Sequence, residues 1–162
     1  MLITAVAFWQ IVLAIHIMAV VVAFGVTFAY PLIGAVAARM DPRAMPWYHR
    51  TQELLGKRLI TPGLALVLIA GIYLASELHQ WSSFYVAWGM AVAIIIGALG
   101  GVFFGPSEQK MAELAERDIQ AAGDGEVKWS AEYEVLGRRV AVVGTVVNVL
   151  ILITVYVMTV QS

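Results

Sequence analysis

The sequence predicts an all-α polytopic membrane protein, an antiparallel bundle of four transmembrane helices with both termini outside. Of its 162 residues, 61% are hydrophobic and only 13% are Asp, Glu, Lys or Arg, about half the charged fraction of a soluble domain. Charged residues are absent from four stretches, 1–38, 59–76, 78–107 and 140–162. Each stretch comes close to or exceeds the ~20 apolar residues that a spanning helix needs. This pattern excludes a soluble enzyme, a nucleic-acid binder and a disordered chain.

The charge-free stretches place the elements along a single transmembrane domain, 1–162. Helices are expected because each backbone N–H and C=O must be satisfied within the segment in lipid, and the alternating segments of a membrane β-barrel are absent. The first stretch lacks the basic start of a signal peptide and continues past residue 30, so we expect it to be retained as a span. We expect spans at 4–31, 59–78, 82–105 and 138–160, and cytoplasmic segments at 39–58 and 106–137.

Prolines and glycines indicate where the helices start and stop. Pro31 should end or kink the first helix. Thr61 followed by Pro62 should begin the second helix, or bend a helix that starts earlier. Pro106 should close the third. After it, apolar residues recur at helical spacing over 108–122, which predicts a further helix on the membrane surface or in a hairpin packed on the bundle.

The basic residues predict the orientation of the chain. Eight of the ten lie between spans one and two or between spans three and four, and Arg138 and Arg139 stand at the inner end of span four; the positive-inside rule makes that side cytoplasmic. Both termini and the turn near residue 79 then lie outside. These ten residues are Arg39, Arg43, Arg50, Lys57, Arg58, Lys110, Arg117, Lys128, Arg138 and Arg139.

His16 is the candidate functional residue within the membrane. It lies about twelve residues into the first span, near mid-bilayer, where a histidine is costly and marks a functional site by default. It can ligate haem iron or another metal through a ring nitrogen, alone, with Met18 or Met90, or across two subunits. The alternative is a neutral histidine hydrogen-bonded between helices. The chain has no cysteine, which excludes thiolate and iron–sulfur chemistry.

Two further polar residues bear on this site. Asn148 falls at a depth in span four similar to that of His16. It either fixes the tautomer of His16 or bonds a backbone carbonyl or a second subunit. Arg58 stands at the inner entrance of span two, where it either binds a lipid phosphate or a tetrapyrrole propionate or serves only as a topology anchor.

Span three carries a stripe of small residues, each four positions after the last. Such a stripe is typical of close helix packing, either inside the bundle or between subunits. A flat cofactor on the same surface is a further alternative. The stripe consists of Ala93, Gly97, Gly101 and Gly105.

Several short segments resemble a bacterial membrane superfamily. It includes copper-resistance-protein-D-like proteins, the HemJ type of protoporphyrinogen oxidase and uncharacterised four-helix integral membrane proteins, and the last span is most similar to the uncharacterised branch. The segments that carry the resemblance are Ile15–Val21, Phe28–Leu32, Arg58–Gly63, Ala70–Tyr73 and Val157–Thr159.

The resemblance implies a haem-binding role for the first-helix histidine, which matches His16, and a location in the bacterial cytoplasmic membrane. HemJ-type proteins also carry basic residues and further histidines just after the first span, and a lysine in a later span. Here 32–38 is uncharged and no such lysine is found. The resemblance therefore points to a member that keeps the histidine without porphyrinogen oxidation.

Three functions follow from these features. The first is an inner-membrane protein that binds haem b or a porphyrin through His16; if it is an enzyme, it is a haem-dependent oxidoreductase. The second is a non-catalytic membrane subunit or homo-oligomeric scaffold that packs through the span-three stripe. The third, a small-solute channel or carrier, is disfavoured because no Asp, Glu, Lys or Arg lies within the core of a span. The sequence favours a non-enzymatic role, with lipid and membrane subunits as partners and no nucleic acid.

Overall fold

The fold is an all-helical bundle with four helices long and apolar enough to cross a membrane. The computed structural model describes residues 7–161, and these residues form no strand. The first and last spanning helices are single elements, α1 (Phe8–Met40) and α6 (Ala131–Gln161). The predicted fold class, an all-α four-helix membrane bundle, is confirmed.

The two middle helices are composite. A short 3-10 turn, η1 (Pro42–Ala44), leads from α1 into α2 (Met45–Leu55), which continues through a π-helical segment, η2 (Gly56–Ile60), into α3 (Thr61–Glu77). After a turn, α4 (Phe84–Leu99) continues through a second π-helical segment, η3 (Gly100–Phe104), into α5 (Gly105–Ala122). The segments expected between the spans are therefore largely helical extensions of the spans themselves.

No helix ends at Pro31, Pro62 or Pro106. At Pro62 the alternative holds in which an earlier helix continues to the proline, whereas the helix end predicted at Pro106 is wrong. Pro31 lies inside α1, which continues to Met40. Pro62 and Pro106 each stand at the second residue after a π-helical segment, within continuous helices. A proline has no N–H to donate and its ring crowds the carbonyl four residues earlier; the wider π turn accommodates both effects. The third helix therefore does not close at Pro106.

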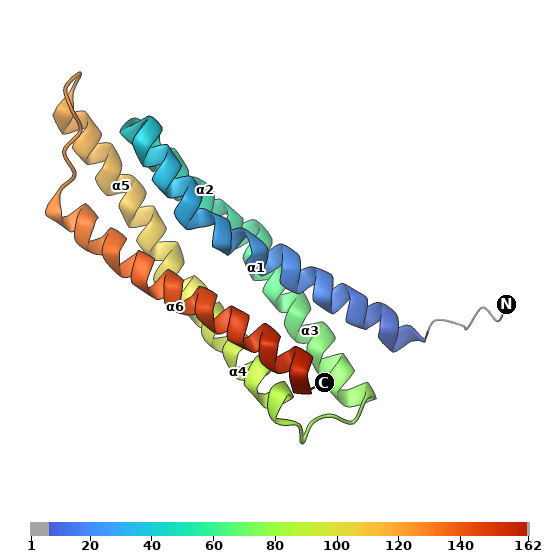
Figure 1. Ribbon diagram of the computed structural model, residues 1–162. Helices are drawn as coiled ribbons and strands as arrows, with labels where there is room; N and C mark the ends of the chain where they lie inside the picture. Colours follow the sequence, from blue (N-terminus) through green and yellow to red (C-terminus); the bar gives the residue numbers. More distant parts are fainter. Residues whose placement is uncertain (1–6, 162) are drawn as a thin grey trace.

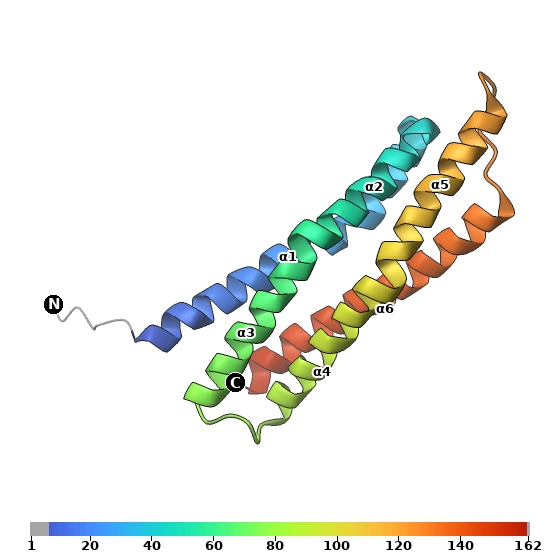
Figure 2. The same ribbon diagram turned by 180° about the vertical axis from the view of Figure 1, so that it is seen from behind.

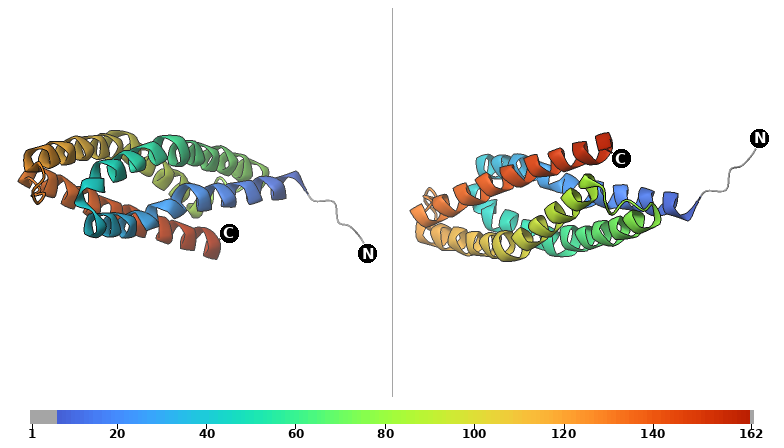
Figure 3. Two further views of the ribbon diagram at one scale, coloured as in Figure 1. Left: turned by 90° about the horizontal axis from the view of Figure 1, so that it is seen from above. Right: turned by 90° about the horizontal axis from the view of Figure 1, so that it is seen from below.

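The helices lie in an elongated antiparallel bundle. Figure 1 shows α1 beside α2 and α3, and α6 beside α4 and α5. The same pairing is seen from behind in Figure 2, and Figure 3 shows the bundle from above and from below, with the helices running lengthwise across each view. We name two parts: the polar half, formed by α2, α5 and the start of α6 (131–139), and the apolar half, formed by α3, α4 and the rest of α6. Helix α1 runs through both halves.

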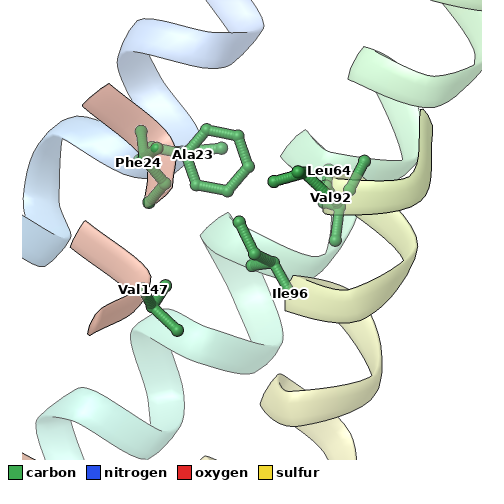
Figure 4. Close-up of a cluster of buried hydrophobic side chains, with 8 residues drawn as sticks. Ala23, Phe24, Leu64, Val92, Ile96 and Val147 are labelled. Atoms are coloured by element: carbon green, nitrogen blue, oxygen red, sulfur yellow. The ribbon is translucent and has the colours of Figure 1, made fainter. Parts of the chain in front are cut away.

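Each half has its own core. In the apolar half, Phe24 from α1, Leu64 from α3 and Val147 from α6 converge on Ile96 of α4 (Figure 4). The core of the polar half contains larger and more polar side chains, Met45, Tyr48, Met111, Leu114, Ala115 and Tyr133. The two cores stabilise one continuous bundle, apolar in one half and more polar in the other.

The outer surface of the apolar half is hydrophobic. Large aliphatic side chains face outward from every helix, among them Val21, Ile69, Ile94 and Leu152. In water such a surface would be an aggregation liability. In a bilayer it is the face that contacts acyl chains, so the exposed surface supports an integral membrane protein.

Candidate functional site

The ring of His16 lies between α1 and α3, and its hydrogen bond fixes its tautomer. Nδ1 is 3.0 Å from the main-chain oxygen of Val67. Because a carbonyl oxygen only accepts, Nδ1 carries the proton and donates it. In the neutral imidazole the second nitrogen, Nε2, then keeps its lone pair. A backbone carbonyl on one nitrogen is also the common way in which proteins orient a histidine that ligates a metal through the other.

Gly71 makes room for this ring. It lies one turn after Val67 on α3, and a Cβ there would come within 3.3 Å of Cε1 of His16. That distance is tighter than ordinary van der Waals contact, so a side chain would push the imidazole away from the α3 backbone. The glycine therefore belongs to the structure of the histidine site.

His16 has no cluster of other metal-binding residues around it. Within residues 7–161 no group of three or more His, Cys, Asp or Glu side chains could hold a metal ion. His49 lies in the polar half and His79 in the turn between α3 and α4. A metal bound at His16 would therefore need most of its ligands from a cofactor, as iron has in haem.

Asn148 bonds α1 through Thr27 and not through His16. Its Oδ1 accepts from the hydroxyl of Thr27 at 2.8 Å, and its Nδ2 donates to the main-chain oxygen of Thr27 at 3.4 Å. That oxygen stands four residues before Pro31, which has no N–H to offer it. Asn148 thus supplies a donor that the proline removes. The hypothesis that Asn148 fixes the tautomer of His16 is wrong, because the carbonyl of Val67 does so.

Arg58 lines a shallow groove between α1 and α3. The groove has a volume of about 380 Å³, and Arg58 is its only charged side chain. His16 is not among the lining residues, although the lining ends beside it, at Ile15 and Leu66. Arg58 lies nine residues before Val67, the partner of His16, which is ~13 Å at the usual rise, so the cation and the histidine stand at opposite ends of the groove. The lining is formed by Ile15, Met18, Ala19, Val22, Arg58, Leu59, Pro62, Gly63 and Leu66.

The small-residue stripe of span three is divided between two environments. Ala93 is buried in the core of the apolar half, and a Cβ at Gly97 would lie 3.0 Å from Leu64 of α3. Gly101 has nothing within 4 Å of the place where its Cβ would be. Gly105 approaches only a carbonyl of its own helix, at 3.3 Å. The first half of the stripe packs inside the bundle, and Gly101 leaves open space.

The polar half contains a buried chain of hydrogen bonds that the sequence analysis did not single out. Nδ1 of His49 lies 2.7 Å from Oε2 of Glu108, and Nε2 of His49 lies 2.9 Å from the hydroxyl of Tyr133. His49 is 3% exposed and Glu108 is 5% exposed. The three side chains come from α2, α5 and α6, so this cluster joins all three helices of the polar half.

Further groups surround this cluster. The amide of Gln52 lies 3.4 Å from the same Glu108 oxygen. Burial first, and then the negative charge of Glu108, raise the pKa of the Tyr133 phenol, which lies beyond the spans. The phenol therefore keeps its proton at neutral pH. Tyr48 donates to the main-chain oxygen of Tyr30 at 2.7 Å, which ties α2 to α1.

A second polar cluster closes the hairpin between α5 and α6. Asp118 accepts from the backbone N–H of Ser130 at 2.8 Å and from the Arg117 guanidinium at 3.1 Å. Burial by itself raises the pKa of Asp118, but the hydrogen bonds from Ser130 and Arg117 outweigh it and hold the pKa below its usual value. This carboxylate orders the start of α6.

One sequence signal could have identified these acids. Glu108 and Asp118 fall on the face of α5 that also carries Met111 and Ala115, at spacings of three to four residues. Acidic residues on the apolar face of a helix are buried only when they are paired. By this rule a buried Glu108 needs a polar partner. His49, which follows the buried Tyr48 on α2, is that partner.

The site and the fold together define a four-helix membrane protein with a single oriented histidine between its first two spanning helices. No protein-family model, no curated protein and no solved structure matches this chain.

Proposed function

We propose that this chain is a multi-pass protein of the bacterial cytoplasmic membrane that binds haem b through Nε2 of His16. One observation carries the proposal: the hydrogen bond from Nδ1 to the carbonyl of Val67 leaves the lone pair of Nε2 available. A neutral imidazole in this tautomer is the form that ligates iron. The resemblance to haem-associated membrane proteins at the segment around His16 supports the same assignment.

The one ligand atom that the chain offers at this site, Nε2 of His16, fits a haem site with a single axial histidine. Haem brings four nitrogen ligands of its own, so the protein needs to supply only an axial one. When bound, the haem supplies one-electron chemistry. The chain contributes the ligand, its fixed tautomer and an apolar surrounding, since the stretches 1–38 and 59–76 that contain His16 and Val67 carry no charged side chain. We assign no catalytic residue, and we propose a haem-binding rather than an enzymatic role.

The orientation that we propose places the polar half in the cytoplasm. All ten Lys and Arg residues lie in 39–58 and 106–139, which the helices bring to one end of the bundle. By the positive-inside rule this end is cytoplasmic. Both termini and the turn at 78–83 then lie on the outer side.

The test is the absorption spectrum of the purified protein, produced in cells with ample haem. The wild type is expected to show a Soret band that shifts when dithionite reduces the iron. His16→Ala should lose the band, whereas the control His79→Ala, which removes an exposed histidine, should keep it. A colourless wild type, or a band unchanged in His16→Ala, would contradict haem ligation by His16. His16 would then serve as a hydrogen bond between helices.

A second candidate function, a membrane scaffold, is favoured by the open space at Gly101. A Cβ at Gly101 has no neighbour within 4 Å, so we expect Gly101→Leu to leave the fold intact, which circular dichroism checks. If the stripe contacts a second subunit, Gly101→Leu changes the oligomeric state, which light scattering in detergent measures. Gly97→Leu cannot make this distinction, because it would also collide with Leu64 inside the bundle.

A further inference from the structure

The groove between α1 and α3 combines an apolar lining with one cation at its end. Its walls come from the outward-facing Ile15, Met18 and Leu66, and small residues such as Ala19 and Gly63 form its base. Arg58 stands at the end nearest the polar half and is exposed. Among residues 7–161, Arg58 has no ion-pair partner, whereas its neighbour Lys57 pairs with Glu53.

The dimensions of the groove match one leaflet of a bilayer. Its lining runs from Ile15 to Val22 on α1 and from Leu66 on α3 back to Arg58 on η2, which is ~10–12 Å at the usual helical rise. One leaflet contributes about half of the ~30 Å hydrocarbon core. Arg58 precedes the charge-free stretch that begins at Leu59. The guanidinium therefore reaches the level of the lipid headgroups while the groove extends into the hydrocarbon.

We propose that this groove binds one anionic phospholipid, with an acyl chain along the lining and the phosphate on Arg58. Guanidinium groups bind phosphate with charge-assisted, often bidentate hydrogen bonds. Lipid tails are as apolar as leucine side chains, so the groove alone gives no preference among lipids. Selectivity must come from the charge at Arg58, and a single basic side chain gives a preference of about fivefold for an anionic over a zwitterionic lipid.

Native mass spectrometry of the protein released from nanodiscs tests this proposal. The discs contain dioleoyl-phosphatidylglycerol and dioleoyl-phosphatidylcholine, which share acyl chains and differ in headgroup charge. The wild type is expected to retain phosphatidylglycerol about fivefold above its share in the disc. Arg58→Gln should abolish the enrichment. Arg138→Gln, which removes an exposed arginine of α6 outside the groove, should keep it.

A second pair of variants tests the groove itself. Leu66→Trp fills the groove and should reduce the retained lipid of both kinds. Ile69→Trp adds the same bulk at an outward-facing position of α3 that is not part of the groove, and it should have no effect. Both positions are exposed, so both variants should fold, which circular dichroism checks.

Three outcomes would overturn the proposal. They are equal retention of the two lipids by the wild type, equal loss of enrichment in Arg58→Gln and Arg138→Gln, and displacement of the retained lipid by added haemin. The last outcome would identify the groove as a tetrapyrrole site. Lipid retention does not depend on His16, so failure of the haem proposal and failure of the lipid proposal are distinguishable in the same preparation.

Discussion

The two halves of the bundle are held together by different interactions. In the apolar half, small residues let the helices approach closely, as where Gly63 of α3 faces Ala23 of α1. Few polar contacts join the helices there. In one of them, Asn148 donates a hydrogen bond to the Thr27 carbonyl, which has no backbone donor. In the polar half, a buried carboxylate, an imidazole and a phenol join three helices through hydrogen bonds below 3 Å.

The difference follows from the surroundings of each half. Lipid tails are as apolar as the helix surfaces, so helices in a bilayer associate through packing and a few hydrogen bonds. In water the amphipathic faces of α2 and α5 are driven together by apolar burial. A polar pair buried inside that interface then costs stability unless its hydrogen bonds are complete. A disrupted contact should therefore cost most in the polar half.

The largest effect is expected at Glu108. Glu108→Ala leaves Nδ1 of the buried His49 without its carboxylate partner, and breaking a buried pair in this way costs roughly 3–5 kcal/mol. Thermal unfolding in detergent, followed by circular dichroism, measures the loss. Glu108→Gln, which can still hydrogen-bond, should lose less. Glu113→Ala removes an exposed carboxylate of the same helix and should change little; an equal effect of Glu108→Ala and Glu113→Ala would show that the buried pair is not a major source of stability.

A matched pair of glycines tests packing in the apolar half. A Cβ at Gly63 would lie 2.7 Å from Cβ of Ala23, so Gly63→Ala should separate α1 from α3 at a cost of roughly 1–3 kcal/mol. Gly25 has nothing within 4 Å, and Gly25→Ala should stabilise its helix by about 0.5 kcal/mol. Unfolding midpoints that shift in the same direction for both variants would contradict close packing at Gly63.

Asp118 should make the α5–α6 hairpin sensitive to acid. Its folded pKa lies below the usual value, so its contribution is fully present above the unfolded pKa of ~3.9 and is lost as the pH falls through the folded value. Asp118→Asn should remove roughly 1.5 kcal/mol at neutral pH and flatten this acid dependence. Hydrogen exchange of the backbone amides at the start of α6, followed as a function of pH, measures this acid dependence. An unchanged acid profile in the variant would rule out the carboxylate as its source.

The smallest effect is expected at Asn148. Asn148→Leu removes the donor to the Thr27 carbonyl, and hydrogen bonds between membrane helices average about 0.6 kcal/mol. In a Pro31→Ala background, residue 31 has a backbone N–H that can donate to the Thr27 carbonyl. Asn148→Leu should therefore cost less stability in that background. The double-mutant cycle measures this difference. Strict additivity of the two substitutions would mean that Asn148 does not serve the carbonyl freed by Pro31.

The sequence predicted the apolar half better than the polar half. Spanning helices follow from local composition, because charge-free stretches of this length have few alternatives in lipid. The pairing of His49 with Glu108 joins residues 59 positions apart, and only the fold brings them together. At Pro62 the sequence left open whether a helix begins or an earlier one continues, and at Pro106 it predicted a helix end; a π-helical turn before each proline lets the helix continue.

At the histidine site, too, the sequence does not reveal which residues pair. The position of His16 near mid-bilayer could be counted from the sequence, but its partner could not. Asn148 lies at a similar depth and has the right chemistry, so it was a reasonable prediction. Which helix faces α1 at that level decides the outcome, and there α3 brings the carbonyl of Val67 to Nδ1.

The most direct test of the haem assignment is nitrogen NMR of the protein labelled with ¹⁵N-histidine, with His16→Ala used to assign the signal of His16. The hydrogen bond to Val67 predicts a protonated Nδ1 and an unprotonated Nε2 in the haem-free protein. Stoichiometric haemin should then shift or broaden the Nε2 signal of His16 and leave those of His49 and His79 in place. A protonated Nε2 with a bare Nδ1, or an Nε2 signal indifferent to haemin, would contradict ligation through this nitrogen.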